Sequence, residues 1–383
     1  MNELQSPSAI LGIGTAVPEH VIDQKETADR IAEALQDQPI IARFAKGIFR
    51  KCGVETRYTC EENLLAPSAT CRYMPGTMAA AKAPVTKERM NVYREHALPL
   101  AMKAAQLALA DGQADPSSVT HLITVSCTGQ FLPGLDALLV RSLGLPEDVQ
   151  RIPLTFIGCA AGLKALGLSR QLSLVNPVAK ILVVCVELCT LHVQPSARKE
   201  DIFAASFFGD GASACLVGTT GREARDLFYL TNHHSVLLPD SLSEMVWTVG
   251  NYGFELVLSP NIPRLIGEWV PKHLLTQLSL KRPTLWAIHP GGRAIIDTLQ
   301  DELQLSDVET YASRKILRQY GNMSSATILF VMEEMKKNLQ QSNEQEAEGI
   351  ALAFGPGLTM ETVKMSYRHT DDHSLRKGSG VYA

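Results

Sequence analysis

Phe156-Ile157-Gly158-Cys159-Ala160-Ala161-Gly162 is the stretch around which the predicted fold is organised. An apolar run ends here in a cysteine framed by small residues, and a helix-like segment follows. A thiol at the start of a helix lies near unpaired amides and the positive end of the helix dipole, and both favour the thiolate. The segment therefore predicts a nucleophile. The alternative is a buried cysteine that packs as a small apolar side chain, the commoner role of a single cysteine.

The composition is that of a globular enzyme, with 383 residues of which 45% are hydrophobic and 20% charged. No run of eighteen apolar residues occurs, and residues 1–10 lack a basic region followed by an apolar one, so we expect neither a membrane span nor a secretory signal. A net charge of −4 without a long basic block argues against a nucleic-acid partner. The 8 cysteines lack metal-binding spacing, which predicts free thiols, no metal site and a cytoplasmic location.

Strands and helices alternate along the first part of the chain, a pattern typical of a layered α/β fold. Apolar residues recur at helical spacing in some segments, and β-branched residues fill the short segments between them. The elements expected in order are a strand over 8–18, a helical stretch over 25–51, an irregular segment over 60–86, a helix over 87–112, a strand over 121–126, a helix over 135–143, a strand over 152–157, a helix to 174, and strands over 180–187 and 212–218.

The second part of the chain repeats the pattern. A polar stretch over 219–226 is the expected linker, which divides the chain into halves 1-222 and 223-383 and suggests a duplicated architecture. The polar residues from His369 onward predict a loose tail. The expected elements are a strand over 285–288, helices over 294–303, to about 320, and to about 339, and strands over 349–354 and 359–367.

Three chemically capable residues stand where strands end or helices begin. Cys159 is followed 130 positions later (159 to 289) by His289 and 33 positions after that (289 to 322) by Asn322. Because loops at one end of a sheet are where α/β proteins gather chemistry, we expect a composite site. Each residue also has a simpler interpretation: His289 as a hydrogen-bonded strand-end histidine, and Asn322 as the cap of the following helix.

Several motifs resemble those of type III polyketide synthases, the chalcone synthase-like enzymes. The motifs are Gly158-Cys159-Ala160-Ala161-Gly162, Phe208-Gly209-Asp210-Gly211-Ala212, Ile288-His289-Pro290-Gly291-Gly292, Gly321-Asn322-Met323-Ser324-Ser325 and Gly355-Pro356-Gly357-Leu358-Thr359. They occur in the order that the family has and span most of the chain. The resemblance implies a thiolase-like fold with two similar αβαβα halves in a five-layered α-β-α-β-α arrangement, a homodimer, small-molecule CoA thioesters as substrates, and no metal or redox cofactor.

The resemblance also assigns the reaction. Cys159 would attack a starter acyl-CoA and hold the growing chain, with His289 stabilising its thiolate as an imidazolium. Malonyl-CoA would then lose CO2 while His289 and Asn322 donate hydrogen bonds to the thioester oxygen, where enolate charge develops. The carbanion would attack the acyl group on Cys159, and the cycle can repeat before the product cyclises.

Other positions follow from the same resemblance. Phe208 matches the phenylalanine between the CoA tunnel and the acyl cavity, and Phe254 matches a second one, although either aromatic ring has ordinary core packing as its alternative. Leu132 falls where the family reaches across the dimer interface. Lys51 falls on a basic CoA-phosphate position, with Arg50 and Lys46 nearby, although the family's full basic spacing is absent. The expected cavity-lining residues are Cys127, Thr128, Glu187, Cys189, His192, Ser324, Gly355, Pro356 and Gly357.

The sequence departs from the plant enzymes at two positions. Cys127 and Cys189 replace hydroxyl residues, as in bacterial members that accept long fatty acyl starters and make alkylpyrones or alkylresorcinols. This places the hydroxyl relay for aldol cyclisation in question, although Glu187 and Ser324 remain. We therefore expect an aliphatic acyl-CoA starter and a pyrone or resorcinol-type product.

Three other classes of protein compete with this interpretation. A ketoacyl synthase III-like enzyme of fatty-acid initiation uses the same three residues, but the motif at His289 and the stretch 355–359 favour the polyketide branch. A papain-type hydrolase shares the residue order, but the chain lacks its aromatic, Ser-containing cysteine segment. The third is a non-catalytic thiolase-like scaffold that binds a partner or a lipid.

Overall fold

The computed structural model describes residues 7–220, 227–277, 282–342 and 346–369. Nine strands in these ranges form one mixed sheet in the order β11-β12-β13-β8-β1-β7-β6-β4-β5. The first half of the chain contributes β1 (Ser8–Ala16), β4 (His121–Ser126), β5 (Gln150–Thr155), β6 (Lys180–Leu188) and β7 (Asp210–Thr219), and the second half contributes β8 (Leu227–Leu237), β11 (Leu285–Ile288), β12 (Glu346–Gly355) and β13 (Thr359–Arg368).

The two halves of the sheet have the same pairing pattern. β1 pairs antiparallel with β7, β7 antiparallel with β6, and β6 parallel with β4. Likewise β8 pairs antiparallel with β13, β13 antiparallel with β12, and β12 parallel with β11. A short contact between β1 and β8, with Ala9 opposite Tyr229 and Ile10 opposite Phe228, joins the halves. The same α/β topology thus occurs twice.

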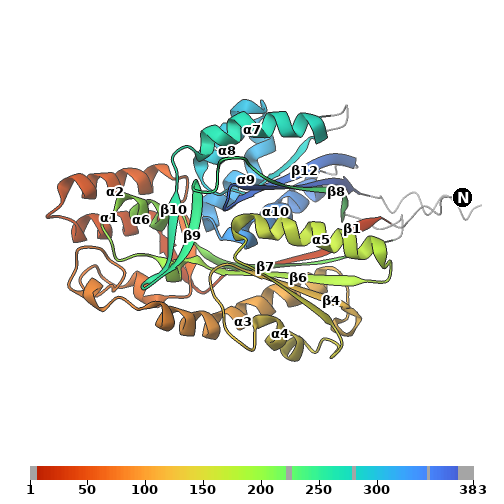
Figure 1. The fold of residues 1–383 in the computed structure, drawn as a ribbon, viewed down its shortest axis with the longest axis horizontal. Coiled ribbons are helices and arrows are strands. Elements are labelled where there is room, and N and C mark those ends of the chain that lie inside the picture. The colour runs from red at the N-terminus through yellow and green to blue at the C-terminus, as the bar shows by residue number, and fades with distance from the viewer. Residues whose placement is uncertain (1–6, 221–226, 278–281, 343–345, 370–383) are drawn as a thin grey trace, which may run out of the picture.

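Helices lie on both outer faces and between the half-sheets, which gives the expected five layers (Figure 1). The outer layers hold α3 (Thr86–Asp111) and α4 (Leu135–Leu143) on one side, and α7 (Ile262–Gln277), α8 (Arg293–Glu302) and α9 (Asp307–Tyr320) on the other. The inner layer holds α5 (Ala161–Val175) and α10 (Thr327–Ser342). Leu163, Leu166, Ile328 and Leu329 of these inner helices are fully buried, as expected for helices packed on several sides.

Most predicted elements of the main sheet and its helices are present, but residues 25–51 are not one helix. The chain forms β2 (His20–Asp23), α1 (Gln24–Ala34) and α2 (Pro39–Lys51), with β3 (Thr56–Thr59) beside β2. The break falls before Pro39, which lacks an amide hydrogen and is tolerated only in the first turn of a helix. The helix α6 (Lys199–Ala205) and the hairpin β9 (Met245–Gly250) and β10 (Gly253–Leu258) were not predicted.

Two predictions concern residues that are not described. The expected boundary at 222/223 falls within 221–226, and all but the first residue of the expected tail falls within 370–383. In the part of the chain that is described, no helix is both long and apolar enough to cross a membrane.

Candidate active site

Cys159 lies in a short 3-10 turn, Gly158–Ala160, that leads directly into α5. Gly158 has φ +77°, and Pro356 packs against its Cα so closely that a Cβ has no room. Phe156 also has a positive φ, of 54°, which is a strained conformation for an aromatic residue. The cysteine is therefore presented on a sharp turn that requires glycine beside it.

His289 follows β11, and its backbone N–H donates to the Leu352 carbonyl of β12 at 2.8 Å. The side chain is only 1% exposed, and neither ring nitrogen has a hydrogen-bond partner among the described residues. A buried imidazole without a partner is costly unless something else satisfies it. The ring faces the same cavity that Cys159 lines.

Asn322 lies between α9 and α10, and its backbone is held by the strand-like segment at Phe207. Its Oδ1 accepts from the Ser324 N–H at 2.8 Å, and its Nδ2 donates to the Gly291 carbonyl at 3.2 Å. These bonds fix the amide so that Nδ2 lies 3.9 Å from the Cys159 Sγ. Because α10 begins only at Thr327, Asn322 is not the cap of that helix, contrary to the simpler interpretation.

Cys159, His289 and Asn322 line one cavity of about 900 Å³. Burial raises the pKa of Cys159 to about 11, although hydrogen bonds from Ser324 and Asn322 favour the thiolate. Burial also lowers the pKa of His289 to about 3. Burial thus favours the neutral thiol and the neutral imidazole, whereas the family resemblance implies a thiolate and an imidazolium.

A second polar group lies beside the nucleophile. The buried carboxylate of Glu187 accepts from the Thr128 hydroxyl at 2.8 Å and from the Ser325 hydroxyl, and the Cys127 Sγ lies 3.4 Å from it. The same Sγ lies 3.1 Å from the Ser324 hydroxyl. Burial raises the pKa of Glu187. The structure therefore joins Glu187, Cys127 and Ser324 in one chain of contacts with a thiol in the middle.

An aromatic wall bounds the large cavity on one side. Phe208 and Trp247 line both this cavity and a smaller one of about 30 Å³ behind it. Phe254 lines only the smaller cavity, where its ring stacks on His192 at 4.2 Å. The His192 Nε2 donates to the Thr128 carbonyl at 2.7 Å and its Nδ1 accepts from the Phe254 N–H at 2.9 Å. Burial lowers the pKa of His192 to about 3, so the ring is neutral.

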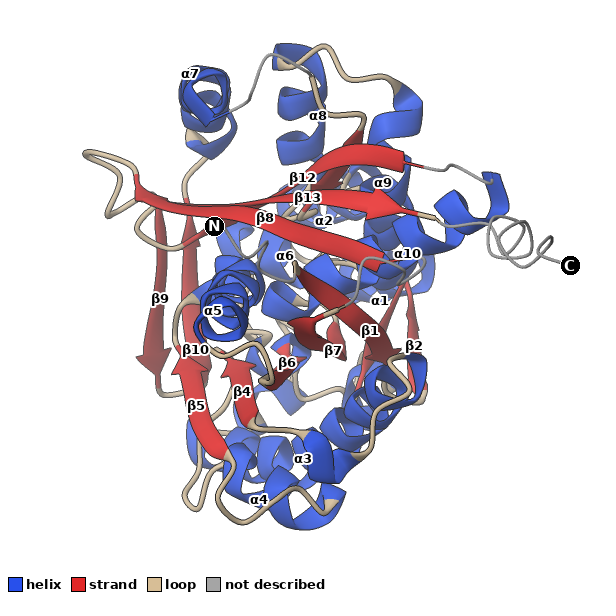
Figure 2. Ribbon diagram, turned by 90° about the vertical axis from the view of Figure 1, so that its right-hand side faces the viewer, coloured by secondary structure: helices blue, strands red, loops and turns tan. Residues whose placement is uncertain are grey.

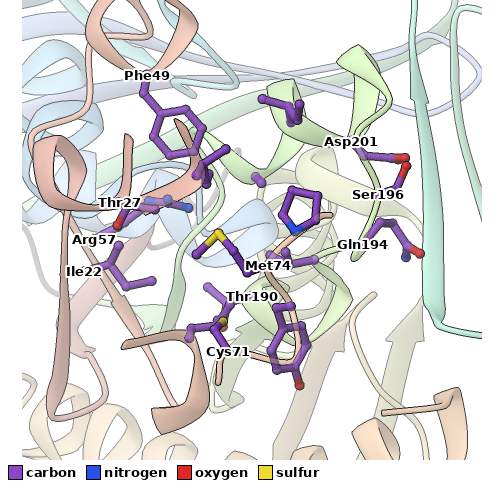
Figure 3. Close-up of a pocket in the computed structure, with 17 residues that line it drawn as sticks. Ile22, Thr27, Phe49, Arg57, Cys71, Met74, Thr190, Gln194, Ser196 and Asp201 are labelled. Carbon is purple, nitrogen blue, oxygen red and sulfur yellow. The ribbon is translucent and has the colours of Figure 1, made fainter. Parts of the chain in front are cut away.

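A third cavity, of about 40 Å³, lies beyond the second (Figure 3). Apolar side chains such as Phe49 and Met74 surround most of it. It shares four lining residues with the second cavity, and the second shares three with the first, so the three cavities adjoin one another in that order. The shared residues are Val193, Gln194, Asp201 and Ala205 for the inner pair, and Phe208, Trp247 and Leu256 for the outer pair.

Only one of the three expected basic residues lines the large cavity. Lys51 lines it, but Arg50 and Lys46 do not, and Lys46 pairs with Asp29 at 3.3 Å. Helix periodicity explains this, since positions one and five residues before Lys51 point to other faces of α2. Lys199 on α6 and Arg293 at the start of α8 line the cavity instead. Arg293 directly follows the His289 motif, a signal that sequence analysis missed, whereas no sequence signal marks Lys199.

The remaining predicted residues separate into three groups. Pro356, Phe208, Cys127 and Ser324 line the large cavity, and Cys189 lines the second. Thr128, Glu187, Gly355 and Gly357 do not line the large cavity; Gly355 packs against Ala160, and Gly357 has φ +98°. Leu132 is 92% exposed and lies outside these cavities. The apolar walls of the large cavity were not predicted, although the alternating apolar residues of β9 and β10 indicate them. These walls include Met245, Trp247, Leu256 and Leu258.

The fold and the Cys-His-Asn constellation are those of a thiolase-like condensing enzyme, and comparison with known proteins defines the family. Residues 2–221 match the N-terminal domain of chalcone and stilbene synthases, and residues 230–367 match the C-terminal domain. The chain therefore belongs to the chalcone and stilbene synthase family, the type III polyketide synthases, which are condensing acyltransferases.

One curated relative and one solved structure agree with this family, and a second solved structure shares the fold. It is 32% identical to the "Alpha-pyrone synthesis polyketide synthase-like Pks18" of Mycobacterium tuberculosis, over 92% of this chain and 90% of that protein. The C-terminal type III polyketide synthase domain of Steely1 from Dictyostelium superposes with a TM-score of 0.84 at 28% identity, over 94% of this chain and 99% of that domain. PKS-I of the brown alga Ectocarpus siliculosus has the same fold, with a TM-score of 0.86 at 24% identity, covering 96% of this chain and 100% of that one.

Proposed function

We propose that this enzyme loads an aliphatic acyl-CoA starter on Cys159, extends it by decarboxylative condensation with malonyl-CoA, and releases an α-pyrone. The observation that carries the chemistry is the 3.9 Å approach of the Asn322 Nδ2 to the Cys159 Sγ, in a cavity where no described residue is hydrogen-bonded to the His289 ring nitrogens. His289 and Asn322 can both donate hydrogen bonds to the oxygen of a thioester bound beside Cys159, and such bonds stabilise the negative charge that this oxygen gains.

The neutral state of both groups suggests how loading begins. A neutral His289 accepts the Cys159 proton as the sulfur attacks the starter thioester, and CoA leaves with the acyl group transferred to Cys159. Malonyl-CoA then binds with its thioester oxygen near His289 and Asn322. Loss of CO2 leaves an enolate whose charge these donors stabilise, and its carbon attacks the acyl-Cys159 carbonyl. The bond from that carbonyl to the Cys159 sulfur then breaks, which frees Cys159 and leaves the extended acyl chain on CoA. These steps need no metal and no redox cofactor.

The starter class follows from the walls of the cavities. The large cavity is lined mainly by apolar and aromatic side chains, including Phe207, Met245, Leu258 and Phe354. Burying a methylene group there stabilises binding by about 0.8 kcal/mol, whereas a polar starter has few partners. A long aliphatic acyl chain fits this lining best.

The product class follows from Cys127. An aldol ring closure needs an acidic relay, but a thiol is a weak hydrogen-bond donor and acceptor, and burial raises the pKa of Cys127 further. Lactone closure needs only attack by an enol oxygen on the thioester carbonyl. The α-pyrone named for the Mycobacterium tuberculosis relative agrees with this choice. A resorcinol is the alternative product.

The mouth of the cavity suits a CoA thioester. Lys51, Lys199 and Arg293 bring three positive charges to its lining, against Glu200 and Asp297. Arg293 pairs with Asp297 at 3.1 Å, and Asp297 also pairs with Arg314 at 2.7 Å, so two guanidinium groups share one carboxylate and these three residues together keep a positive charge. We also propose a cytoplasmic homodimer in which the exposed Leu132 packs against the second copy.

Mass spectrometry of products tests this proposal. The wild-type enzyme and a Cys159→Ala variant are incubated with malonyl-CoA and acyl-CoAs from acetyl to hexadecanoyl. We expect alkylpyrones from the long starters and no product from the variant. A requirement for malonyl-carrier protein in place of malonyl-CoA would indicate a ketoacyl synthase III-like enzyme, and absence of CO2 release from either donor would indicate a binding scaffold.

A further inference from the structure

The buried carboxylate of Glu361 joins β13, β8 and the first turn of α5, the helix that follows Cys159. Glu361 on β13 is 0% exposed, and its Oε1 lies 2.8 Å from the Lys164 Nζ of α5. Its Oε2 lies 2.6 Å from the His233 Nε2 of β8, and the Ser235 hydroxyl donates to Oε1 at 2.6 Å. These partners outweigh burial and lower the pKa of Glu361, so the group is ionised. We call Glu361, Lys164, His233 and Ser235 the positioning cluster.

The positioning cluster connects the two halves of the molecule. Lys164 lies in the first turn of α5, five positions after Cys159, whereas the other three members of the positioning cluster belong to the C-terminal half. Figure 2 shows β8 and β13 side by side next to α5. Gly167, one turn further along α5, packs directly on the His233 ring and leaves no room for a Cβ. The helix α5, which directly follows the turn that holds Cys159, is thus in close contact with the positioning cluster.

A second contact fixes the other end of the same segment. β13 follows the turn at Gly355–Gly357, and in that turn Pro356 packs on Gly158 while Gly355 packs on Ala160. The nucleophile turn is therefore held between this turn and the ion pair at Lys164. Both contacts come from the β12–β13 hairpin, whose first strand also binds the His289 backbone. The β12–β13 hairpin thus fixes the positions of Cys159 and His289 relative to each other.

We propose that the positioning cluster sets the reactivity of Cys159 by fixing α5 on the C-terminal half. The Sγ of Cys159 already lies 3.9 Å from the Asn322 Nδ2, near the limit for a hydrogen bond to sulfur. A small shift of α5 therefore removes the Asn322 and Ser324 support for the thiolate, and misplacement of a reacting group by about 1 Å costs roughly 10² in rate. The residues of the cluster touch no reacting atom, so their role is positional.

The test is the rate at which iodoacetamide alkylates Cys159, measured from pH 6 to 11 by mass spectrometry of the Cys159 peptide. Lys164→Met removes one partner of the buried carboxylate, and Lys164→Arg keeps the charge. Lys336→Met is the matched control, because Lys336 also joins the two halves in a 2.8 Å ion pair, with Asp111, but lies on α10. Thermal unfolding of each variant reports the loss of general stability.

We expect Lys164→Met to slow alkylation at pH 8 about tenfold and to shift its pH midpoint upward, with Lys164→Arg close to the wild type. Lys336→Met lowers the unfolding temperature but leaves the alkylation profile unchanged. Equal alkylation in Lys164→Met and wild type, or an equal slowing in Lys336→Met, would overturn the proposal. If Lys164→Met does not fold, Ser235→Ala, which removes the hydrogen bonds to Glu361 and from Lys164 but keeps their ion pair, gives the same comparison at smaller amplitude.

The role of the positioning cluster rests on the proposed function, in which Cys159 is the reactive thiol, but alkylation of Cys159 by iodoacetamide uses no CoA substrate. An unchanged alkylation profile therefore counts against the positioning cluster alone, and an absence of polyketide product counts against the proposed function alone. Where product forms, Lys164→Met is expected to lower kcat and leave the KM for malonyl-CoA within about twofold, because no cluster residue lines the large cavity.

Discussion

The Cys159 Sγ and the Asn322 Nδ2, 163 positions apart in sequence and on opposite halves of the molecule, lie 3.9 Å from each other. The amide is not free to turn, because the Ser324 N–H and the Gly291 carbonyl bind its two ends. The amide is therefore held beside the nucleophile, with its Nδ2 3.9 Å and its Oδ1 4.0 Å from the Sγ, as preorganised electrostatic stabilisation requires.

Replacing Asn322 by Ala is expected to impair decarboxylation more than loading. Loss of one such donor typically lowers the rate about 10²–10³-fold, and the charge on the thioester oxygen is greatest in the decarboxylation step. CO2 release from malonyl-CoA and acyl transfer to Cys159 are measured separately. Equal loss of both partial reactions would contradict the division of roles.

The reactivity of Cys159 is expected to rise with pH well into the alkaline range. Since burial raises its pKa to about 11, the thiolate fraction increases about tenfold for each pH unit between 7 and 10. The measurement is the iodoacetamide alkylation rate of the wild-type enzyme. A rate that is already constant above pH 6 would instead indicate a thiolate paired with an imidazolium.

The protein is expected to lose stability as the pH falls below 6.5. The pKa values of His289 and His192 are both about 3 in the folded chain and about 6.5 when unfolded, so the unfolded state binds protons first. Each histidine contributes stability above pH 6.5 that is lost by up to about 1.4 kcal/mol per pH unit between 6.5 and 3. Urea unfolding of the wild type and of His192→Gln at pH 7.5 and 5 measures this. The pH dependence of the variant is expected to be shallower, and identical slopes would contradict the assignment to His192.

Removing the basic residues at the cavity mouth is expected to weaken the binding of CoA thioesters. Lys199→Ala and Arg293→Ala each remove one contact to a phosphate, a charge-assisted bond worth about 1.5–3 kcal/mol, which raises KM about tenfold or more. Lys46→Ala is the control, because Lys46 pairs with Asp29 and does not line the cavity. Pantetheine thioesters lack the CoA phosphates, so their KM values are expected to stay unchanged in all three variants. A similar rise in KM for pantetheine thioesters would show that the residues act on the cavity shape.

The sequence was sufficient for the strands of the main sheet other than β8 (Leu227–Leu237) and for the three residues Cys159, His289 and Asn322. Strands such as Lys180–Leu188 carry their own β-branched signal, and Cys159, His289 and Asn322 stand in motifs at strand and helix ends. The direction in which each side chain points could not be predicted from the sequence. Arg50 and Lys51 are adjacent in sequence, yet only Lys51 lines the cavity, because successive helix positions differ by about 100° around the axis.

Charge states were also beyond the sequence. A helix start favours a thiolate, but the burial that opposes it depends on residues throughout the chain. The hairpin Met245–Leu258 was missed because its turn, Asn251-Tyr252, lacks the usual Asn-Gly or Asp-Gly signal. Its alternating apolar residues supply part of the wall of the large cavity, which we propose holds the starter acyl chain.

The most direct test of the central claim is intact-protein mass spectrometry of the enzyme after brief incubation with dodecanoyl-CoA alone. The account predicts a mass increase of one dodecanoyl group, located on the Cys159 peptide, absent from Cys159→Ala and discharged as product when malonyl-CoA is added. An acyl group on another cysteine, or no adduct in an enzyme that still makes product, would contradict it.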